Sequence, residues 1–443
     1  MEHKVLSGWG LTPKALTHEQ VFDKAKVGSM FFPKSSMIPR GLGRGYGDCA
    51  VNGSGVTSNT SGLTTFSLEG SVLVAEAGAS IDEILGHIVP NGYFIPVTPG
   101  TKFVTIGGAI AADVHGKNHH KDGSFGNFVL EIDLMIADGS VRKISPVIDP
   151  RLFWATVGGM GLTGVILSAR VELTAIKTSK ILSTNIVCKN LDELMNEMVR
   201  ADDYAKYSVA WVDTLARSKK LGRSILSIGD HAAKTDLGKR LRKSPLQYSS
   251  KQFISFPKIA FSGLINRFTV RLFNALWFYK AKFTKKKKLV SFDSFFYPLD
   301  GVRNWNYVYG NGGFVQYQFS VPDDASNLVK YVLDKLSEQK IPSFLSVLKR
   351  FGENGNGLIS FPSKGWTLAV DIPTGVIGLG ELLDELDVKL VGAGGRIYLA
   401  KDSRMNPNFI ESMYPLLNEF RKVKNEIDPD NLFQSNLSRR LGL

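Results

Sequence analysis

The sequence predicts a protein of two domains in which short strands alternate with a smaller number of helices. The chain has 443 residues, more than one compact core usually holds, since domains typically contain roughly 100–200 residues. Strand-like and helical patterns alternate along the chain, and a new unit begins near Lys180. Many of the 44 glycines fall in the first third, which indicates loops that approach another group closely.

The first unit, up to residue 179, is predicted to consist mainly of strands. A helix is expected over Ser80–Ile88, because Ser80 is placed to cap its first turn. The dipeptide Asp138-Gly139 is typical of a turn and is expected to end a strand. The strands expected in this unit are Leu73–Ala77, Leu130–Ala137, Ser140–Ile144 and Val165–Leu173.

The remainder of the chain alternates helices with strands. Helices are expected at Leu191–Ala201 and Ala325–Gln339, from the spacing of their apolar residues. The strands expected are Ser208–Val212, Phe314–Val321 and Trp366–Ile372. The last stretch is expected to hold a strand at Arg396–Ala400 and a helix near Asn408–Val423.

The composition limits where the protein can act. Its two cysteines, Cys49 and Cys188, cannot form a disulfide framework or a cysteine-based zinc site, and they favour a reducing compartment. No apolar run at the N-terminus has the length of a signal peptide. No apolar stretch reaches the roughly 18 residues that a membrane span needs. We therefore expect a cytoplasmic protein, or one bound peripherally to the inner membrane.

The positive charge is concentrated in residues 217–290. This segment has 19 Lys or Arg against two acids, a net charge of +17, whereas the whole chain carries +13. Apolar residues recur with helical spacing from Phe261 to Trp277, and four lysines follow at 285–288. A basic amphipathic helix on an anionic membrane has this pattern. Nucleic-acid binding would use the same charge, but no nucleic-acid module is recognisable, and a solvated loop is the third interpretation.

Three glycine-rich loops fall within 90 residues. Residues 40–47 read RGLGRGYG, and alternate glycines leave room for backbone N–H groups to crowd a phosphate. The second loop contains TPGT (98–101) and TIGG (105–108), and the third is HGKNHHKDGSFG (115–126). One such loop alone would be a flexible turn, but three together indicate a long ligand that contains a diphosphate.

The sequence does not match the other common nucleotide-binding and metal-binding motifs. The G-x-G-x-x-G at 159–164 precedes strand-like residues and lacks the acid of a Rossmann site. No P-loop sequence occurs. The third loop contains His115, His119 and His120, but it has no glutamate at the position that H-E-x-x-H requires. Neighbouring lysines would also repel a cation. We therefore expect no metal.

Several motifs, in order along the chain, point to one family. They include RGLGRGYGD (40–48), PVTPGTKFVTIGGAIAADVHGKNHHKDGSFGN (96–127), YSVAW (207–211), FYPLD (296–300), QYQF (316–319), LKRFG (348–352), FPSKGWTLAVDIP (361–373) and GGRIYLAKDSR (394–404). On these motifs the chain resembles the vanillyl-alcohol-oxidase superfamily of flavoenzymes, and within it the branch that oxidises decaprenylphosphoryl-ribose. The resemblance covers nearly the whole chain.

This resemblance implies an α+β fold: a two-lobed PCMH-type FAD-binding domain and a cap (substrate) domain built on an antiparallel sheet. The FAD-binding domain would take residues 1–179 and the return segment 395–443. The cap domain would take residues 180–394, including the basic, membrane-facing segment 217–290.

The resemblance also implies FAD as the cofactor. Many relatives attach the flavin through a histidine where this chain has Tyr46, so non-covalent binding is expected. The implied cofactor-binding residues are Arg40, Gly41, Leu42, Gly43, Arg44, Gly45, Tyr46, Gly47, Asp48, Pro99, Gly100, Thr101, Thr105, Ile106, Gly107, Gly108, Ala112, His115, Ile166 and Tyr398.

The catalytic positions that the resemblance implies are Lys401 and His115. Lys401 is the first candidate for binding or deprotonating the reacting hydroxyl, and it can act as a base only if its pKa is depressed. Ala369 stands where the mycobacterial type has a cysteine. The implied substrate-binding residues are Lys117, Tyr297, Gln316, Gln318, Lys349, Phe351, Thr367 and Ala369.

The expected activity is oxidation of the C2 hydroxyl of a polyprenyl-phospho-pentose to the 2-keto sugar, as half of an epimerisation. The expected partners are the polyprenyl-phosphate-linked sugar, an NAD(P)H-dependent keto-sugar reductase and an anionic membrane surface, and no nucleic acid. An FAD-dependent oxidase of a soluble sugar, alcohol or aldonolactone is the alternative, and a membrane-associated binding protein with a structural flavin is a third.

Overall fold

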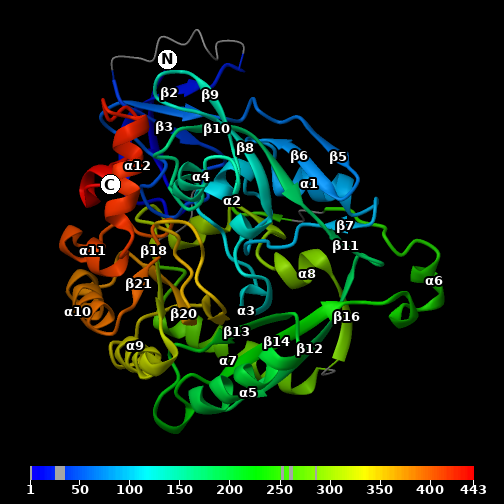
Figure 1. Ribbon diagram of the computed structural model, residues 1–443. Helices are drawn as coiled ribbons and strands as arrows, with labels where there is room; N and C mark the ends of the chain where they lie inside the picture. The colour runs from blue at the N-terminus through cyan, green and yellow to red at the C-terminus, as the bar shows by residue number, and fades with distance from the viewer. Residues whose placement is uncertain (1, 25–34, 251–253, 259–262, 285–286) are drawn as a thin grey trace.

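Three sheets form the framework of the computed structural model, which describes residues 2–24, 35–250, 254–258, 263–284 and 287–443 (Figure 1). The first sheet has the strand order β1-β2-β4-β3. Its strands are β1 (Glu2–Ser7), β2 (Lys14–Val21), β3 (Met37–Arg40) and β4 (Val56–Asn59). Strand β3 ends at Arg40, so the first glycine-rich loop starts where this sheet stops.

The second sheet is five-stranded and antiparallel, in the order β5-β6-β10-β8-β9. Its strands are β5 (Phe66–Glu69), β6 (Val72–Glu76), β8 (Val129–Met135), β9 (Val141–Ile144) and β10 (Val165–Glu172). Helix α1 (Ile81–Ile88) begins where Ser80 and Glu83 form a reciprocal capping box. The predicted helix and cap are confirmed. Helix α2 (Ile106–Ala111) packs against β6 and β10.

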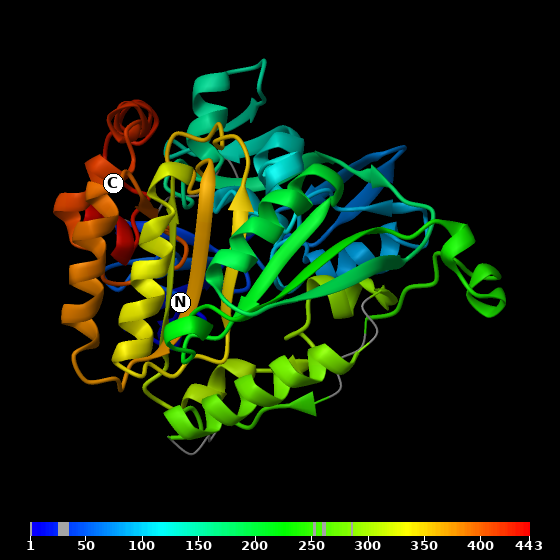
Figure 2. The ribbon, with the colours of Figure 1, turned by 90° about the horizontal axis from the view of Figure 1, so that it is seen from below.

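The third sheet has eight strands in the order β16-β12-β14-β13-β19-β20-β18-β21. They are β12 (Lys180–Cys188), β13 (Tyr207–Val212), β14 (Ser224–His231), β16 (Lys287–Ser291), β18 (Phe314–Val321), β19 (Ser346–Phe351), β20 (Gly365–Pro373) and β21 (Arg396–Ile397). The longer helices of this part are α5 (Leu191–Tyr204), α7 (Arg267–Phe283), α9 (Asn327–Glu338) and α10 (Leu379–Gly392). Helices α9 and α10 lie side by side along the strands, and α7 lies on the outside (Figure 2).

Short elements complete the fold. They include α3 (His119–Asp122), α4 (Pro150–Thr156), α6 (Lys239–Arg242), α8 (Phe292–Phe296), β7 (Tyr93–Phe94), β11 (Thr174–Ala175), β15 (Ile254–Ser255), β17 (Val302–Arg303) and a 3₁₀ turn at Trp305–Tyr309. The chain therefore has the expected α+β class, with mixed helices and largely antiparallel sheets. The division at residues 179 and 395 stays a prediction.

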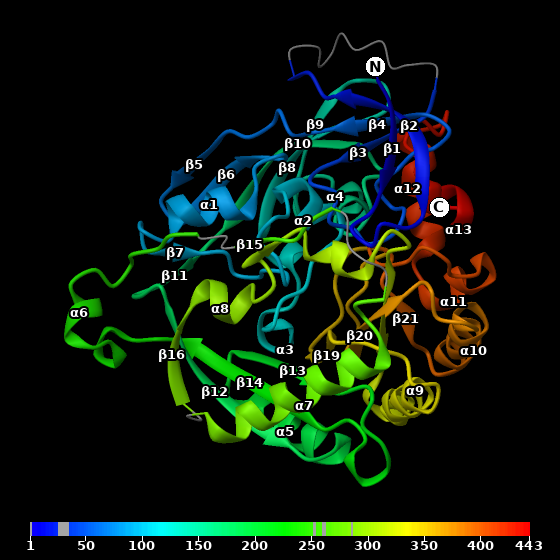
Figure 3. The same ribbon diagram turned by 180° about the vertical axis from the view of Figure 1, so that it is seen from behind.

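The end of the chain returns to the first sheet (Figure 3). Its helices are α11 (Ile410–Met413), α12 (Leu417–Ile427) and α13 (Asn436–Leu441). Phe433 bridges to Met37 of β3, and Arg440 pairs with Asp48 at 3.0 Å. The C-terminal segment therefore contacts both β3 and Asp48, which lie at the two ends of the first glycine-rich loop.

Two predictions for the last stretch were wrong. The helix near Asn408–Val423 is two helices, α11 and α12, because the backbone leaves the helical conformation at Tyr414 and Pro415 follows with no N–H to donate. The strand predicted at 396–400 ends at Ile397, where the chain leaves the sheet edge and turns toward the site.

The basic amphipathic helix was misplaced. Helix α7 runs over Arg267–Phe283, since the Asn266 side chain caps it by accepting the N–H groups of Phe268 at 2.9 Å and Thr269 at 3.1 Å. The start predicted at residue 261 lies outside the described residues. Of the four-lysine run, residues 287 and 288 belong to edge strand β16, which pairs with β12, and residues 285 and 286 lie outside the described part.

Candidate functional site

The first glycine-rich loop is tightly enclosed on one side and has free N–H groups. A Cβ added to Gly47 would meet the backbone oxygen of Asp402 at 1.7 Å, so only glycine fits there. Arg40 directs its guanidinium to the carbonyls of Ala50 and Ser7, at 3.0 and 2.8 Å. Within the described part of the chain, the N–H groups of residues 41–45 donate no hydrogen bond. Such a cluster of free donors is a site for an anion.

The second loop meets the first. A Cβ on Gly41 would lie 2.3 Å from Oγ1 of Thr105, so the two loops are in direct contact. Thr105 caps α2 by accepting the N–H of Gly108 at 3.1 Å. The N–H groups of Ile106 and Gly107 donate to the carbonyls of Ala79 and Ala77. These bonds hold the start of α2 close to the segment that follows β6. By contrast, the N–H groups of residues 100 and 101 have no acceptor among the described residues.

Tyr398 joins the second sheet region to the eight-stranded sheet. Its N–H donates to the carbonyl of Gln318 at 3.0 Å, and its hydroxyl donates to the carbonyl of Ala112 at 2.8 Å. Its ring stacks on Phe361 with centroids 4.5 Å apart. Ile166, on β10, is buried. Sequence reasoning did not single out Phe361.

His115 lies between two side chains of the eight-stranded sheet. Its Nδ1 lies 2.9 Å from Nζ of Lys349, and its Nε2 lies 3.0 Å from the amide nitrogen of Gln318. Phe351 is buried against the His115 ring, with centroids 4.8 Å apart. Burial first, and then the charges of Lys349 and Lys401, lower the pKa of His115 well below its ordinary value.

The other two histidines of the third loop face separate partners. Nδ1 of His119 accepts the N–H of Gly352 at 3.2 Å, while Nε2 of His120 lies 3.0 Å from the carbonyl of Ala205. Across the described residues, no group of three or more His, Cys, Asp or Glu side chains could hold a metal ion. The ring of His119 packs on Phe351 at 4.5 Å.

Three lysines with lowered pKa values converge on this region. Burial lowers the pKa of Lys117, Lys349 and Lys401 to about 7 in each case. For Lys349 this value reflects burial first and then the charges of Lys117 and Lys401. Lys117 donates to the carbonyl of Phe295 and lies 4.6 Å from that ring. Such shifted groups are typical of functional sites.

One face of the eight-stranded sheet supplies the polar side chains. In its register Gln316 is opposite Asp371, Gln318 is opposite Ala369, and Thr367 is opposite Lys349. The prediction that both glutamines share a face is confirmed by this register. On this face Ala369 and Lys349 are half-buried, whereas Gln316, Gln318 and Thr367 are buried.

Asp371 is a site residue that sequence reasoning missed. Its Oδ1 accepts a hydrogen bond from the Gln316 amide, and burial raises its pKa to about 7, opposed by that bond and by Lys401. The spacing of residues along the predicted strand could have identified Asp371. Asp371 stands two residues after Ala369 on a predicted strand, and therefore on the same face.

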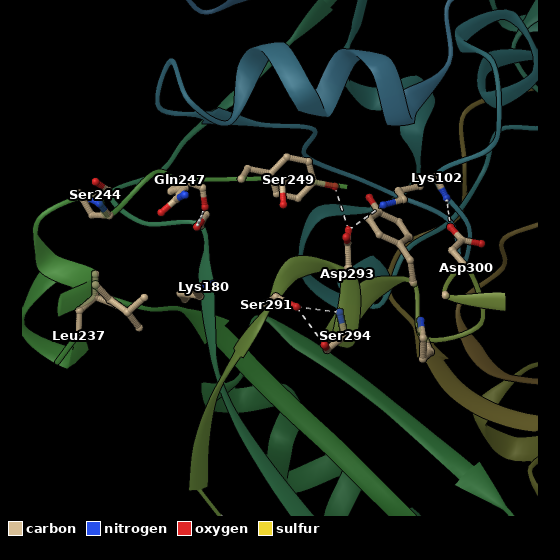
Figure 4. A pocket seen from close by; sticks show the side chains of 17 residues that line it. Lys102, Lys180, Leu237, Ser244, Gln247, Ser249, Ser291, Asp293, Ser294 and Asp300 are labelled. Carbon is tan, nitrogen blue, oxygen red and sulfur yellow. Dashed lines mark hydrogen bonds and ion pairs between the residues drawn. The ribbon is translucent and has the colours of Figure 1, made fainter. Parts of the chain in front are cut away.

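Tyr297, directly after helix α8, contacts the second loop. Its buried hydroxyl lies 2.6 Å from Oγ1 of Thr98. Behind it lies a cavity of about 500 Å³, lined mainly by polar residues including Lys102, Gln247, Asp293 and Asp300 (Figure 4). Lys102 is neutralised there, 3.0 Å from Asp293 and 3.3 Å from Asp82.

The chain is similar to known proteins along its whole length. Residues 33–145 match the family model described as an FAD binding domain. The chain is 39% identical to the decaprenylphosphoryl-beta-D-ribose oxidase of Mycolicibacterium smegmatis, over 99% of this chain and 98% of that protein. It is 37% identical to an uncharacterised protein of the mprA 5′ region of Streptomyces coelicolor, over 80% of this chain and 98% of that protein. An uncharacterised oxidoreductase of Rhodococcoides fascians is 26% identical over 38% of each chain.

Proposed function

The chain belongs to the decaprenylphosphoryl-β-D-ribose oxidase family of FAD-dependent oxidoreductases, and from this premise we propose that it oxidises the C2 hydroxyl of a polyprenyl-phospho-pentose to the 2-keto sugar. The single observation that carries the proposal is the 39% identity over 99% of the chain. A soluble sugar, alcohol or aldonolactone as substrate is not favoured by this full-length similarity.

The residues present fit FAD. The free N–H groups of residues 41–45, 100 and 101 form a donor cluster suited to the diphosphate, and the glycine at 47 lets this loop lie against Asp402. We propose that these loops hold the diphosphate, and that Ala112, His115, Ile166 and Tyr398 reach the rest of the cofactor. When bound, FAD supplies the acceptor for a hydride. We also propose that it is bound non-covalently.

The protein's own residues would bind and orient the sugar. We propose that Lys401 faces the reacting hydroxyl, where its charge stabilises the developing oxyanion. Gln316, Gln318 and Tyr297 supply donors and acceptors for the other hydroxyls. A phosphate bound beside Lys117 would keep that amine charged, because a nearby negative charge raises the pKa of an amine.

A second protein would complete an epimerisation. Oxidation at C2 leaves a keto sugar, and reduction from the opposite face inverts that centre. We propose an NAD(P)H-dependent keto-sugar reductase as this partner. Its binding would be seen as co-purification with the oxidase or as transfer of the keto sugar between the two enzymes.

Helix α7 supports a membrane surface as a further partner. Its outer face exposes Phe268 (69%), Leu272 (63%), Leu276 (63%) and Phe283 (86%), while its inner face buries Val270, Asn274 and Phe278. Asn274 anchors the helix by donating to Asp213 at 2.7 Å. Within α7 there are four cations and no acid. An exposed apolar stripe flanked by cations has the chemistry of an interfacial helix on anionic lipid.

Such a helix would lie on the membrane without crossing it. Among the described residues no helix is long and apolar enough to span a bilayer. We propose that α7 brings the site to the surface where a polyprenyl-phosphate-linked sugar resides. The exposed position of α7 outside the sheet leaves this face accessible (Figure 3).

An anaerobic titration tests the proposed function. The holoenzyme is mixed with polyprenyl-phospho-ribose, polyprenyl-phospho-arabinose, free ribose and an aldonolactone, and the flavin absorbance is followed. Bleaching by the lipid-linked pentoses with formation of a 2-keto sugar is expected. Bleaching by the soluble compounds, with none by the lipid-linked ones, would contradict the proposal.

A further inference from the structure

The guanidinium of Arg44 contacts aromatic rings but has no hydrogen-bond partner. Its central carbon lies 3.8 Å from the centre of the Trp9 ring and 5.4 Å from that of the Phe103 ring. Its Nε is buried and bonds to no acceptor. Within the part of the chain that the structure describes, this side chain donates no hydrogen bond and forms no ion pair. Its N–H donors are therefore available to a ligand.

Asp300 is the acid whose charge reaches Arg44. Burial lowers the pKa of Arg44, and the charges of Asp300 and Tyr46 oppose this effect. The carboxylate of Asp300 is used elsewhere, because it accepts the N–H of Lys102 at 2.8 Å. An arginine side chain stays charged in a folded protein. Among the described residues, Arg44 is therefore a charged group without a counter-ion in direct contact.

A guanidinium in these surroundings suits a phosphate. Its planar fork of N–H donors matches two phosphate oxygens, and its faces can stack on aromatic rings at the same time. Two phosphates could come near this loop: the diphosphate of the cofactor, and the phosphate that joins lipid and sugar in the proposed substrate. The backbone N–H groups of residues 41–45 already form the donor cluster proposed for the cofactor. The side chain of Arg44 contacts Trp9 instead, so it is available to the second phosphate.

Backbone hydrogen bonds fix the position of Trp9 beside the first glycine-rich loop. The N–H of Trp9 donates to the carbonyl of Gly45 at 2.7 Å, and the N–H of Gly10 donates to the carbonyl of Tyr46 at 3.2 Å. The carbonyl of Gly10 accepts the N–H of Phe314 at 2.8 Å. The segment of Trp9 and Gly10 therefore lies between this loop and the first residue of β18.

An aromatic cluster connects Arg44 to helix α7. Its buried members are Trp305, Tyr309 and Phe314, and its partly buried members include Trp9, Tyr46, Ile265 and Phe344. At one end Trp9, the ring under Arg44, packs on Trp305 with centres 5.9 Å apart. At the other end Phe344 packs on Phe273, an exposed ring of α7, at 6.1 Å. Tyr309 and Phe314 join the two ends, so an apolar path runs from the proposed membrane face of α7 to Arg44.

The order of these groups matches the order of groups in a lipid-linked sugar. Tyr46, whose ring contacts Lys401 at 3.5 Å, stands two residues after Arg44, so the two Cα atoms are at most about 7 Å apart. In a β-ribosyl phosphate the phosphate is on C1, next to the carbon that would be oxidised. Lipid, phosphate and sugar would thus meet the aromatic cluster, Arg44 and Lys401 in turn.

We propose that Arg44 binds the phosphodiester of the lipid-linked sugar, that the partly buried rings of the aromatic cluster contact the adjoining isoprene units, and that this pair of contacts selects lipid-linked over soluble sugars. The inference rests on the proposed function. Lys117 is the other cation that could face this phosphate. Its neighbour Phe295 packs in the buried core on Phe296, with ring centres 5.0 Å apart. The apolar path to α7 therefore favours Arg44 as the partner of the phosphate.

Binding of farnesyl phosphate to the holoenzyme tests the proposal without turnover. Calorimetric titration compares the unmodified enzyme with Arg44→Met, and farnesol is the uncharged comparison ligand. Arg44→Met should bind farnesyl phosphate about 10–100-fold more weakly, because charge-assisted hydrogen bonds are lost, with no comparable loss for farnesol. Arg44→Lys keeps the charge without the planar fork and should lose affinity to an intermediate extent. Arg200→Met, a change at an exposed arginine paired with Glu197, is the matched control.

The flavin content of the variants distinguishes the two phosphates. Both Arg44 variants should keep FAD, measured as the ratio of flavin to protein absorbance, because the backbone N–H groups of the loop are unchanged. Loss of FAD from Arg44→Lys would assign the guanidinium to the cofactor and overturn the proposal. Unchanged affinity of the Arg44 variants for farnesyl phosphate, or a loss seen only in Lys117→Met, would overturn it as well. Arg44→Lys decides the result by itself where Arg44→Met does not fold.

Flavin reduction separates this proposal from the proposed function. In anaerobic single turnovers, Arg44→Met should raise the half-saturating concentration of polyprenyl-phospho-ribose by about 10–100-fold, and it should have a much smaller effect with a polyprenyl β-riboside that lacks the phosphate. Equal effects on the two sugars would overturn the role of Arg44. Failure of polyprenyl-phospho-ribose to reduce the unmodified enzyme would instead contradict the proposed function. The two failures are distinguishable, because the binding of farnesyl phosphate is measured without oxidation.

Discussion

The amino group of Lys401 lies 3.5 Å from the centre of the Tyr46 ring, and the N–H of Tyr46 donates to the carbonyl of Ala400 at 2.9 Å. These contacts tie the segment after β21 to the glycine-rich loop near the start of the chain. Burial raises the pKa of Tyr46 well above its ordinary value, so the phenol is neutral and its ring is a suitable face for the cation. The first glycine-rich loop and Lys401 are thereby held together.

Lys401→Met is expected to leave FAD bound and to slow flavin reduction by about 10²–10⁴-fold, because it removes the charge at the reacting oxygen and leaves the diphosphate loops intact. The flavin spectrum measures binding, and anaerobic stopped-flow absorbance measures reduction. Lys422→Met, a change at an exposed ion pair with Glu419, is the control. Rates near those of the unmodified enzyme would show that Lys401 has another role.

FAD is expected to leave the protein on acid denaturation, because Tyr46 stands where many relatives have the histidine that bonds to the flavin. After centrifugation the precipitate should be colourless and the supernatant yellow. A yellow precipitate with a mass increase equal to that of FAD would contradict non-covalent binding.

The stability of the enzyme is expected to increase between about pH 7 and pH 10, relative to a Lys349→Met variant. The pKa of Lys349 is about 7 in the folded protein, below the ordinary 10.5. In this window the unfolded chain binds more protons than the folded one, so its free energy of unfolding rises with pH. Urea unfolding at several pH values measures the difference. A difference that is constant with pH would contradict the lowered pKa.

Replacing Phe268, Leu272 and Leu276 of α7 by serine is expected to weaken binding to vesicles that contain anionic lipid, because it removes the apolar stripe but not the buried anchors. Added salt should weaken binding of the unmodified protein. Vesicle sedimentation measures both. Serine at three exposed apolar residues outside α7, Ile377, Val388 and Leu416, is the matched control, and equal loss in both variants would contradict a specific role of α7.

Local signals in the sequence predicted local structure well. Ser80 and Glu83 predict the start of α1, because a capping box depends only on neighbouring residues. The alternation in QYQF predicts that Gln316 and Gln318 share a face, and the register with β20 confirms it. The start of α7 was misplaced, because apolar spacing does not identify the residue whose side chain caps the helix, Asn266.

Long-range relationships could not be predicted in this way. The order of the eight-stranded sheet places β19 between β13 and β20, and no local pattern specifies such pairing. The bond between His115 and Lys349 spans 234 positions. Asp371 was missed because a single acid within an apolar strand is more often a structural residue than a functional one. Family resemblance identified most candidate residues, but only their geometry separates the surroundings of Lys349 from those of Lys401.

The reduction of the flavin by a substrate deuterated at C2 tests the central claim most directly. Enzyme and polyprenyl-phospho-ribose, with hydrogen or deuterium at C2, are mixed anaerobically and the flavin absorbance is followed through one turnover. The account predicts that the C2-deuterated sugar bleaches the flavin several-fold more slowly, and that deuterium elsewhere on the ring has no such effect. Equal rates for the two sugars, or slowing only by deuterium at another carbon, would contradict oxidation at C2.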